Sequence, residues 1–363
     1  MLDSGAFTVW SKGESIDLDA YIAFCHANPH TSYYVALDVI PGKPRDVRSK
    51  TPSSIAASCQ AGWDNYQRMI ETLPVEKVIP VFHQGDDFAW LVKYLEFGTP
   101  YIGISPANDR TTTQKMQWMR TVKPLIFDNV GRPLIKTHGF AVTSYALMKY
   151  WQWHSVDSAS WMSVASYGGI YVPKLRGGKW AFDETPWIIG MSAKSPSAGE
   201  HQFHYTGLSP IVKKTVDRWC EECGVKLGRY EIVDVPPGYK RDLKCELWFD
   251  DVDIKRQAKA EKKAKFVRDK PADKPTQIMR ILERGTSTCH NQRRFVNIQF
   301  MEAANEVLPV DHIYFAGNTG NGLYVEKACN RRLISYYWTI LGKGACDIFE
   351  RHHNAVRRST QCA

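Results

Sequence analysis

The 363-residue sequence lacks any apolar run approaching the roughly 18 to 20 residues that a membrane-spanning helix needs. Its opening residues, MLDSGAF, have neither the basic start nor the apolar core of a secretory signal peptide. These two absences predict a cytoplasmic protein with no membrane partner.

The sequence also lacks the paired cysteine framework of a small secreted protein. Its nine cysteines are an odd number and lie scattered along a chain long enough to fold without crosslinks, so we expect reduced thiols. With 44% hydrophobic and 12% aromatic residues, the chain can bury at least one large core. This composition excludes a disordered tail or linker and predicts a globular protein.

Basic residues are in moderate excess. Forty-seven Lys and Arg against thirty-eight Asp and Glu give a net charge of +9, which suits a polyanionic partner without proving one. Residues 253–274 hold nine Lys or Arg against four Asp or Glu and supply five of these positive charges. This Lys-rich arm is either a solvated surface segment or a segment that follows nucleic-acid phosphates.

Short apolar runs alternate with helix-like stretches as far as residue 180. This alternation is typical of parallel βαβ units and predicts an α/β fold, a (β/α)8 TIM-type barrel with insertions. Seven runs precede residue 180, and His312–Ala316 offers the missing eighth strand from the C-terminal segment. The seven runs are Leu2–Phe7, Tyr33–Val39, Val78–Phe82, Tyr101–Ile104, Leu134–Thr137, His154–Asp157 and Gly169–Val172.

Three regions are expected along the chain. Residues 1–190 would form the main part of the barrel, 191–310 a helical accessory region with the Lys-rich arm, and 311–363 a strand-helix segment that completes the barrel. Helices are expected to begin at the capping residues Asp17, Ser53, Asp86 and Ser209, the last helix ending at Gly224.

Polar or glycine-containing tips follow several of the expected strands. The tips are Asp3-Ser4-Gly5, Asp38, His83-Gln84-Gly85, Gly103, His138-Gly139 and Asp157-Ser158. Because the carboxyl ends of parallel barrel strands meet at one mouth, these tips predict an active site there.

Six motifs carry a family resemblance: LDSGAFTVWSKG, LDVIPG, PVFHQGDDFAWL, YIGISP, KTHGFAVTS and SVDSASW. In this order and spacing they resemble the DNA 7-deazaguanine transglycosylases of phages, which belong to the tRNA-guanine transglycosylase superfamily. The C-terminal HIYFAGNTGNG and RRLISYYW resemble a segment that precedes the LDSGAF strand in such relatives. The chain is therefore expected to be circularly permuted. Alternatively, its start is unusual and Ile313–Phe315 has another use.

The resemblance implies base exchange by double displacement at a glycosidic bond. It assigns Asp157 as the nucleophile that attacks C1′ and Asp3 as the second carboxylate, which assists proton transfer. The alternative for either aspartate is a capping residue at a strand end.

A guanine pocket needs a carboxylate for N1–H and the exocyclic amine, and donors for the carbonyl. Asp38 fits the first need. Gln84 and the backbone of Gly85 and Gly103 fit the second. His83 agrees with the phage group, but it could equally be a hydrogen-bonded core histidine. Ser4 could keep a neighbouring carboxylate ionised or simply form a turn.

Contacts to the nucleic acid are expected from basic and aromatic residues. Lys136 and His138 could contact the phosphate or sugar beside a flipped nucleotide, and Arg331 and Arg332 could hold the backbone. Phe7, Trp10 and Trp161 could stack on the base, although core packing is the more frequent role of such residues.

Cys220 and Cys223 form a CEEC pair, and the tRNA enzymes carry a structural zinc. Cys245, Cys289 with His290, or His201 with His204 could complete such a site. The family spacing is not reproduced, and the pair falls inside an expected helix. We therefore favour two helix thiols, no metal and no required cofactor.

The resulting prediction is a pentosyltransferase that replaces guanine in DNA with a 7-deazaguanine such as preQ0, which would protect phage DNA from host restriction. A phage origin would place the protein in the host cytoplasm, and the tRNA enzymes suggest a homodimer. The alternatives are a tRNA-guanine transglycosylase and a non-catalytic nucleic-acid-binding barrel.

Overall fold

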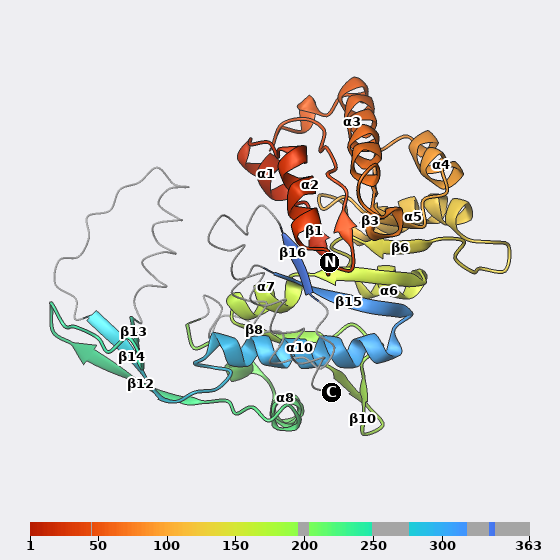
Figure 1. The fold of residues 1–363 in the computed structure, drawn as a ribbon. Coiled ribbons are helices and arrows are strands. Elements are labelled where there is room, and N and C mark those ends of the chain that lie inside the picture. Colours follow the sequence, from red (N-terminus) through yellow and green to blue (C-terminus); the bar gives the residue numbers. More distant parts are fainter. Residues whose placement is uncertain (45, 195–202, 249–275, 318–333, 338–363) are drawn as a thin grey trace. The chain divides into compact units, whose positions relative to one another are not determined.

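The structure is a computed structural model that describes residues 1–363 except 45, 195–202, 249–275, 318–333 and 338–363 (Figure 1). The chain divides into two units, Met1–Ala159 with Ala304–Ala363, and Ser160–Ala303. The first boundary therefore falls at residue 159, not at the expected 190. The Lys-rich arm lies outside the described residues.

The first unit contains a nine-stranded sheet in the order β3-β2-β1-β16-β15-β7-β6-β5-β4, and every pairing in it is parallel. The prediction of a mixed α/β fold with parallel strands is confirmed at this level. The strands are β1 (Leu2–Asp3), β2 (Tyr34–Val35), β3 (Val78–Ile79), β4 (Val81–His83), β5 (Tyr101–Ser105), β6 (Lys136–Gly139), β7 (Trp153–Ser158), β15 (Val310–Gly317) and β16 (Ile334–Tyr337).

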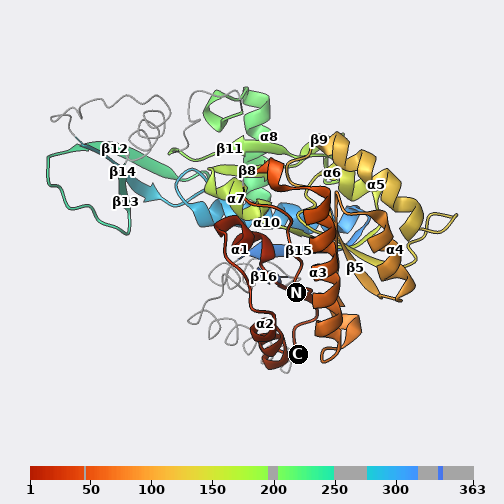
Figure 2. The same cartoon turned by 90° about the horizontal axis from the view of Figure 1, so that it is seen from above.

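Helices follow most of these strands. They are α1 (Ala6–Lys12), α2 (Leu18–Ala27), α3 (Pro52–Ile70), α4 (Phe88–Glu96), α5 (Thr112–Ile126) and α6 (Tyr145–Tyr150), with short 3-10 turns η1 (Val47–Ser49) and η2 (Val75–Lys77). Figures 1 and 2 both show α3 beside α4 and α5. Side-chain caps set the starts: Asp17 accepts from Ala20 N before α2, and Thr51 forms a capping box with Ser54 before α3.

The C-terminal segment supplies two strands to this sheet. β15 pairs with β7 on one side and with β16 on the other, and β16 pairs with β1. The expected seventh strand, Gly169–Val172, is wrong as a member of this sheet. It forms β8 of the second unit and pairs antiparallel with β11.

The two edge strands of the sheet, β3 and β4, belong to one run of chain that Pro80 interrupts. Ala36 N donates to Ile79 O at 2.8 Å, and Gly103 N donates to Pro80 O at 2.8 Å. The first half of residues 78–83 therefore forms backbone hydrogen bonds with β2 and the residues after it, and the second half forms them with β5.

A buried cluster of large side chains lies against the strands of the first unit. It joins Met1, which precedes β1, with Val35 of β2, Ile79 of β3, Tyr101 of β5 and Tyr314 of β15. Burial of these side chains removes apolar surface from water and stabilises the sheet.

The second unit has three small antiparallel sheets and helices. The elements are α7 (Ser160–Ser166), β8 (Gly169–Val172), β9 (Lys174–Arg176), β10 (Lys179–Ala181), β11 (Trp187–Gly190), η3 (Tyr205–Gly207), α8 (Pro210–Glu222), β12 (Arg229–Val235), β13 (Glu246–Trp248), β14 (Thr276–Glu283) and α10 (His290–Val307), which ends in the first unit. Asn297 is fully buried, accepts from Tyr171 N at 2.7 Å and donates to Trp161 O at 3.0 Å, so it ties α10 to β8 and α7.

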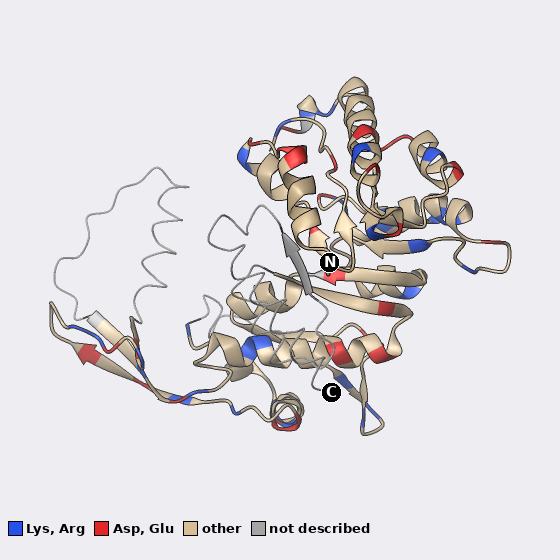
Figure 3. Cartoon of the chain, viewed as in Figure 1, with Lys and Arg blue, Asp and Glu red and all other residues tan. Residues whose placement is uncertain are grey.

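Charged residues of both signs share the outer helices of the first unit, as Figure 3 shows on α3 and α4. Within the described residues, no helix combines the length and the apolar character required to cross a bilayer.

Candidate active site

A cavity of about 670 Å³ opens at the carboxyl ends of the parallel strands of the first unit. Six of its lining residues lie at a strand end or in the loop that follows: Asp3, Asp38, His83, Ser105, Phe140 and Asp157. Carboxyl ends of parallel strands are the usual place for ligand sites in α/β folds. The structure therefore brings four of the expected site residues, Asp3, Asp38, His83 and Asp157, to one pocket.

Asp157 lies near the end of β7 and is only 4% exposed. Ala141 N donates to its Oδ1 at 2.5 Å. Ala141 has φ of 51°, the one positive value among the described non-glycine residues, so the loop after β6 holds a strained backbone at this contact. Burial raises the pKa of Asp157 to about 6, against the opposing hydrogen bonds from Ala141 N and its own amide.

Asp3 ends β1 and lines the same pocket. Gly5 N donates to Asp3 Oδ1 at 3.2 Å, and Gly5 has φ of 74°, a conformation that favours glycine. Burial and then the negative charge of Asp157 raise the pKa of Asp3 to about 8. Near pH 7 Asp3 therefore keeps its proton, whereas Asp157 is largely ionised.

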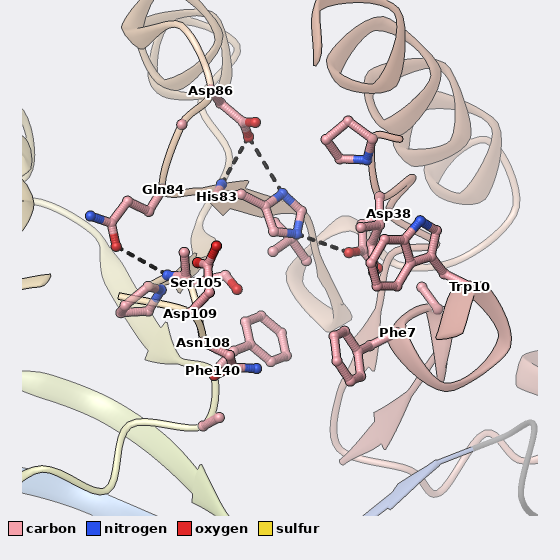
Figure 4. Close-up of a pocket in the computed structure, with 18 of the residues that line it drawn as sticks. Phe7, Trp10, Asp38, His83, Gln84, Asp86, Ser105, Asn108, Asp109 and Phe140 are labelled. Atoms are coloured by element: carbon pink, nitrogen blue, oxygen red, sulfur yellow. Dashed lines mark hydrogen bonds and ion pairs between the residues drawn. The ribbon is translucent and has the colours of Figure 1, made fainter. Parts of the chain in front are cut away.

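His83 lies between two other carboxylates (Figure 4). Its Nε2 is 2.9 Å from Asp38 Oδ2, and its Nδ1 is 3.4 Å from Asp86 Oδ2. Burial lowers the pKa of His83, but the hydrogen bonds and charges of Asp38 and Asp86 outweigh it and raise the pKa to about 10. His83 is thus an imidazolium that fixes one oxygen of Asp38. The other oxygen faces a longer contact, Ser4 Oγ at 3.5 Å.

Asp86 was expected to cap a helix. Instead α4 begins after Asp87, whose side chain accepts from Ala89 N, and Asp86 turns back to accept from His83 N at 2.8 Å. Because Asp86 and Asp87 are adjacent, the sequence alone does not show which of them caps the helix and which contacts His83.

Two other expected base-binding residues differ from the prediction. Gln84 lines the pocket, but its Oε1 accepts from Ala107 N at 3.1 Å and its Nε2 donates to Gln114 O at 3.4 Å (Figure 4). Its amide therefore already holds the loop after β5. A Cβ on Gly103 would overlap the ring of Phe140, so this glycine makes room for a pocket-lining ring and not for a ligand. Gly85, with φ of 120°, does line the pocket.

Two of the expected nucleic-acid contacts, Lys136 and His138, do not line the pocket. Lys136 is exposed at the amino end of β6, the end opposite to the pocket. His138 is fully buried, with Nε2 3.9 Å from Asp157 Oδ1, so it lies beneath the pocket. Arg331 and Arg332 lie outside the described residues.

Aromatic rings line the pocket on more than one side. Phe7 is 56% exposed, and its ring centroid is 5.8 Å from that of Trp10, whose Nε1 donates to Gly42 O. Figure 4 shows these two rings on the side away from Gln84. The pocket is also lined by Phe140, which the sequence did not single out. Trp161, in contrast, is fully buried in α7 of the second unit and does not line the pocket.

The cysteine candidates for zinc lie in the second unit. Cys220 is buried in α8 and Cys223 follows the helix as its cap. Burial raises the pKa of Cys220 to about 12 and also raises that of Cys223, so both thiols are protonated in the metal-free protein. Cys245 donates to Asp242 at 3.3 Å. Across the described residues, no group of three or more His, Cys, Asp or Glu side chains could hold a metal ion.

The pocket therefore combines two carboxylates of different pKa, a third carboxylate held by an imidazolium, and aromatic rings. This set suits a flat ligand with polar edges and a reaction that needs both a proton donor and an anion. Comparison of the chain with known protein families, curated proteins and solved structures finds no match.

Proposed function

We propose that this chain is a pentosyltransferase that exchanges guanine in DNA for a 7-deazaguanine such as preQ0 through a covalent intermediate on Asp157. The observation that carries the proposal is the pairing of Asp3 and Asp157 in one pocket, with pKa values of about 8 and about 6. Two carboxyl groups whose environments separate their pKa values are typical of acid and nucleophile pairs at glycosidic bonds.

We further infer that the sheet closes into a (β/α)8 barrel, with residues 78–83 as a single strand. In a flat sheet β2 and β5 would be six strand spacings, or about 29 Å, apart. Yet the ring of Tyr33, beside β2, has its centroid 5.0 Å from that of Tyr101 in β5. Closure also explains why the two halves of 78–83 bond to opposite edges. The C-terminal β15 and β16 then fill the gap between β7 and β1, as a permuted barrel requires.

In the first half of the reaction, Asp157 attacks C1′ of the target nucleotide. The C1′–N9 bond breaks and its electron pair goes to guanine, which takes the proton of the Asp3 carboxyl group. The products are a glycosyl ester on Asp157, free guanine and an ionised Asp3. The raised pKa of Asp3 suits this role because the group still carries its proton near pH 7.

In the second half, the incoming base gives its N9 proton to the Asp3 carboxylate. N9 then attacks C1′, and the C1′–O bond breaks to return Asp157 as a carboxylate. Two displacements place the new base on the same face of the sugar. The cycle leaves both carboxyl groups in their starting states and consumes no cofactor.

Asp38 is proposed to bind the N1–H and exocyclic amine of the purine. One of its oxygens is held by His83 Nε2 at 2.9 Å, so the carboxylate is oriented before a base enters. Phe7, exposed at the pocket, offers a flat face for the ring system. A base inside a duplex cannot reach such a pocket, so the target nucleotide must be flipped out or single-stranded.

Incubation of the full-length protein with guanine-containing DNA, matched tRNA and radiolabelled preQ0 tests the proposal. Label retained in DNA is the expected result. Label only in tRNA would keep the chemistry and reverse the substrate. Binding of oligonucleotides with label in neither polymer would favour the non-catalytic barrel and contradict the proposal.

A further inference from the structure

Three buried polar side chains form a line beneath Asp157. They come from adjacent strands: Tyr101 from β5, His138 from β6 and Ser155 from β7. Ser155 Oγ is 2.5 Å from Tyr101 OH and 2.5 Å from His138 Nδ1. His138 and Ser155 are fully buried, and Tyr101 is only 1% exposed. Because these side chains are buried away from water, a hydroxyl hydrogen without an acceptor would destabilise the folded protein.

The direction of the hydrogens along this line follows from counting donors and acceptors. If Tyr101 donates to Ser155 and Ser155 donates to His138 Nδ1, every hydroxyl hydrogen is used and the imidazole hydrogen is on Nε2. In the opposite direction the Tyr101 hydrogen has no acceptor among the described residues, and an Nε2 lone pair faces a carboxylate. The first arrangement avoids both costs and fixes the tautomer with hydrogen on Nε2.

His138 Nε2 is aimed at the nucleophile. It is buried without a hydrogen-bond partner among the described residues and lies 3.9 Å from Asp157 Oδ1. Ala141 N donates to the same Oδ1, so two groups of the loop and strand around β6 face this one oxygen. The two oxygens of Asp157 are therefore not equivalent.

We propose that His138, oriented by Ser155 and Tyr101, is a positioning residue that together with Ala141 N holds Oδ1 of Asp157 so that Oδ2 attacks C1′. This inference rests on the proposed function and deepens it. When Oδ2 becomes the ester oxygen, Oδ1 becomes the ester carbonyl oxygen, and the same two donors face it. The Nε2–Oδ1 separation must shorten by about 1 Å to become a hydrogen bond, as contacts in empty active sites often do on substrate binding.

The charge state of His138 agrees with this role. Burial, together with the Met1 amino group and His154, lowers its pKa to about 3. His138 is therefore neutral near pH 7 and has one N–H to give. A neutral donor orients the carboxylate without pairing its charge, so Asp157 keeps its nucleophilic character.

Two amide substitutions distinguish the contact of His138 Nδ1 with Ser155 from that of His138 Nε2 with Asp157. In His138→Asn the short side chain can still accept from Ser155 but cannot reach Asp157. In His138→Gln the amide nitrogen takes approximately the place of Nε2. His26→Gln is the matched control, since His26 is exposed in the last turn of α2 and its Nε2 lies 3.1 Å from Thr72 Oγ1. Ser155→Ala is the second disrupting variant, because it removes the hydroxyl group that donates to His138 Nδ1 and selects the tautomer, and it adds no bulk.

The first measurement is a carbon-13 titration of the Asp157 carboxyl group, assigned through Asp157→Asn, in the full-length protein. We expect His138→Asn and Ser155→Ala to raise the pKa of Asp157 above that of wild type, and His138→Gln and His26→Gln to leave it close to wild type. This measurement does not need turnover, so it decides the positioning of Asp157 even if the protein exchanges no base.

The second measurement is steady-state base exchange. We expect His138→Asn to lower kcat about 100-fold with KM within about twofold, because a misplaced nucleophile slows chemistry more than binding. His138→Gln should recover most of the loss. The inference is overturned if His138→Asn and His138→Gln match each other in both kcat and the pKa of Asp157. An inactive wild type with the expected titration would instead contradict the proposed function alone.

Discussion

Replacing the buried Asp157 carboxylate with a neutral amide should remove activity and stabilise the protein. The substitution Asp157→Asn keeps the size of the side chain and an oxygen that can accept from Ala141 N. It removes the proposed nucleophile and also the negative charge that is buried away from water in the folded protein. Base exchange is expected to fall by at least about 1,000-fold, since Asp157 is the proposed nucleophile and an amide does not form the glycosyl ester.

The stability gain follows from the pKa of Asp157, which is about 6 in the folded protein and 3.8 for an ordinary aspartate. Because burial raises this pKa, the folded state holds a proton that the unfolded state releases, and the ionised carboxylate costs stability as pH rises above about 4. The difference between the two pKa values corresponds to about 3 kcal/mol at full ionisation. The gain from Asp157→Asn should grow from about 1 kcal/mol near pH 4.5 to about 3 kcal/mol near pH 8.

Equilibrium urea unfolding, followed by tryptophan fluorescence at several pH values, measures this difference. Asp64→Asn is the matched control, because Asp64 is exposed on α3 and its loss should change the free energy of unfolding by less than about 0.5 kcal/mol. A variant that is less stable than wild type near pH 8, or whose gain does not vary with pH, would refute the electrostatic reasoning.

Three further predictions concern the rest of the pocket. His83→Gln should raise KM for the base about 10-fold through loss of the Asp38 contact. Because the pKa of His83 is raised, the charged imidazole stabilises the folded protein fully below about pH 6.5, and this stabilisation is lost as pH rises through about 10. The free energies of unfolding of wild type and His83→Gln should therefore converge at high pH. Gly103→Ala should lower the free energy of unfolding by about 1 to 3 kcal/mol, because the added Cβ overlaps the ring of Phe140. The control is Gly62→Ala in α3, where the added Cβ has no neighbour within 4 Å, and it should raise the free energy of unfolding by up to about 1 kcal/mol. Thermal unfolding of the two variants and of wild type measures both effects. Dialysis against EDTA should leave the exchange rate unchanged, and a rate restored only by added zinc would contradict a metal-free mechanism.

Much of the site followed from the sequence because strand ends carry its chemistry. Apolar runs that end in Asp3, Asp38, His83 or Asp157 predicted the strands, and parallel pairing brought their tips to one pocket. Helix starts were predictable where a single capping residue stood alone, as at Asp17.

Pairing and register were not predictable. Gly169–Val172 is a short apolar run buried at every position, and such a run does not distinguish a parallel strand of the main sheet from an antiparallel strand of another. The sequence predicts a strand followed by a helix in residues 311–363, whereas Ile334–Tyr337 in this segment forms a second strand, β16.

The predicted strand begins two residues earlier than β6 does, and this difference explains why Lys136 was expected near the carboxyl end of the strand. The strand was expected at Leu134–Thr137, which puts Lys136 near the carboxyl end. β6 instead runs from Lys136 to Gly139, which puts Lys136 at the amino end and brings Phe140 and Ala141 to the pocket. Short strands leave such boundaries uncertain in sequence alone, and only the pairing with neighbouring strands fixes them.

The most direct test of the paired-aspartate mechanism is an acid quench of the full-length protein during turnover with an oligonucleotide, followed by peptide mapping by mass spectrometry. The account predicts a nucleotide adduct on the peptide that contains Asp157, and no adduct in Asp157→Asn. Base exchange by Asp157→Asn at the wild-type rate, or an adduct on a different residue, would contradict it.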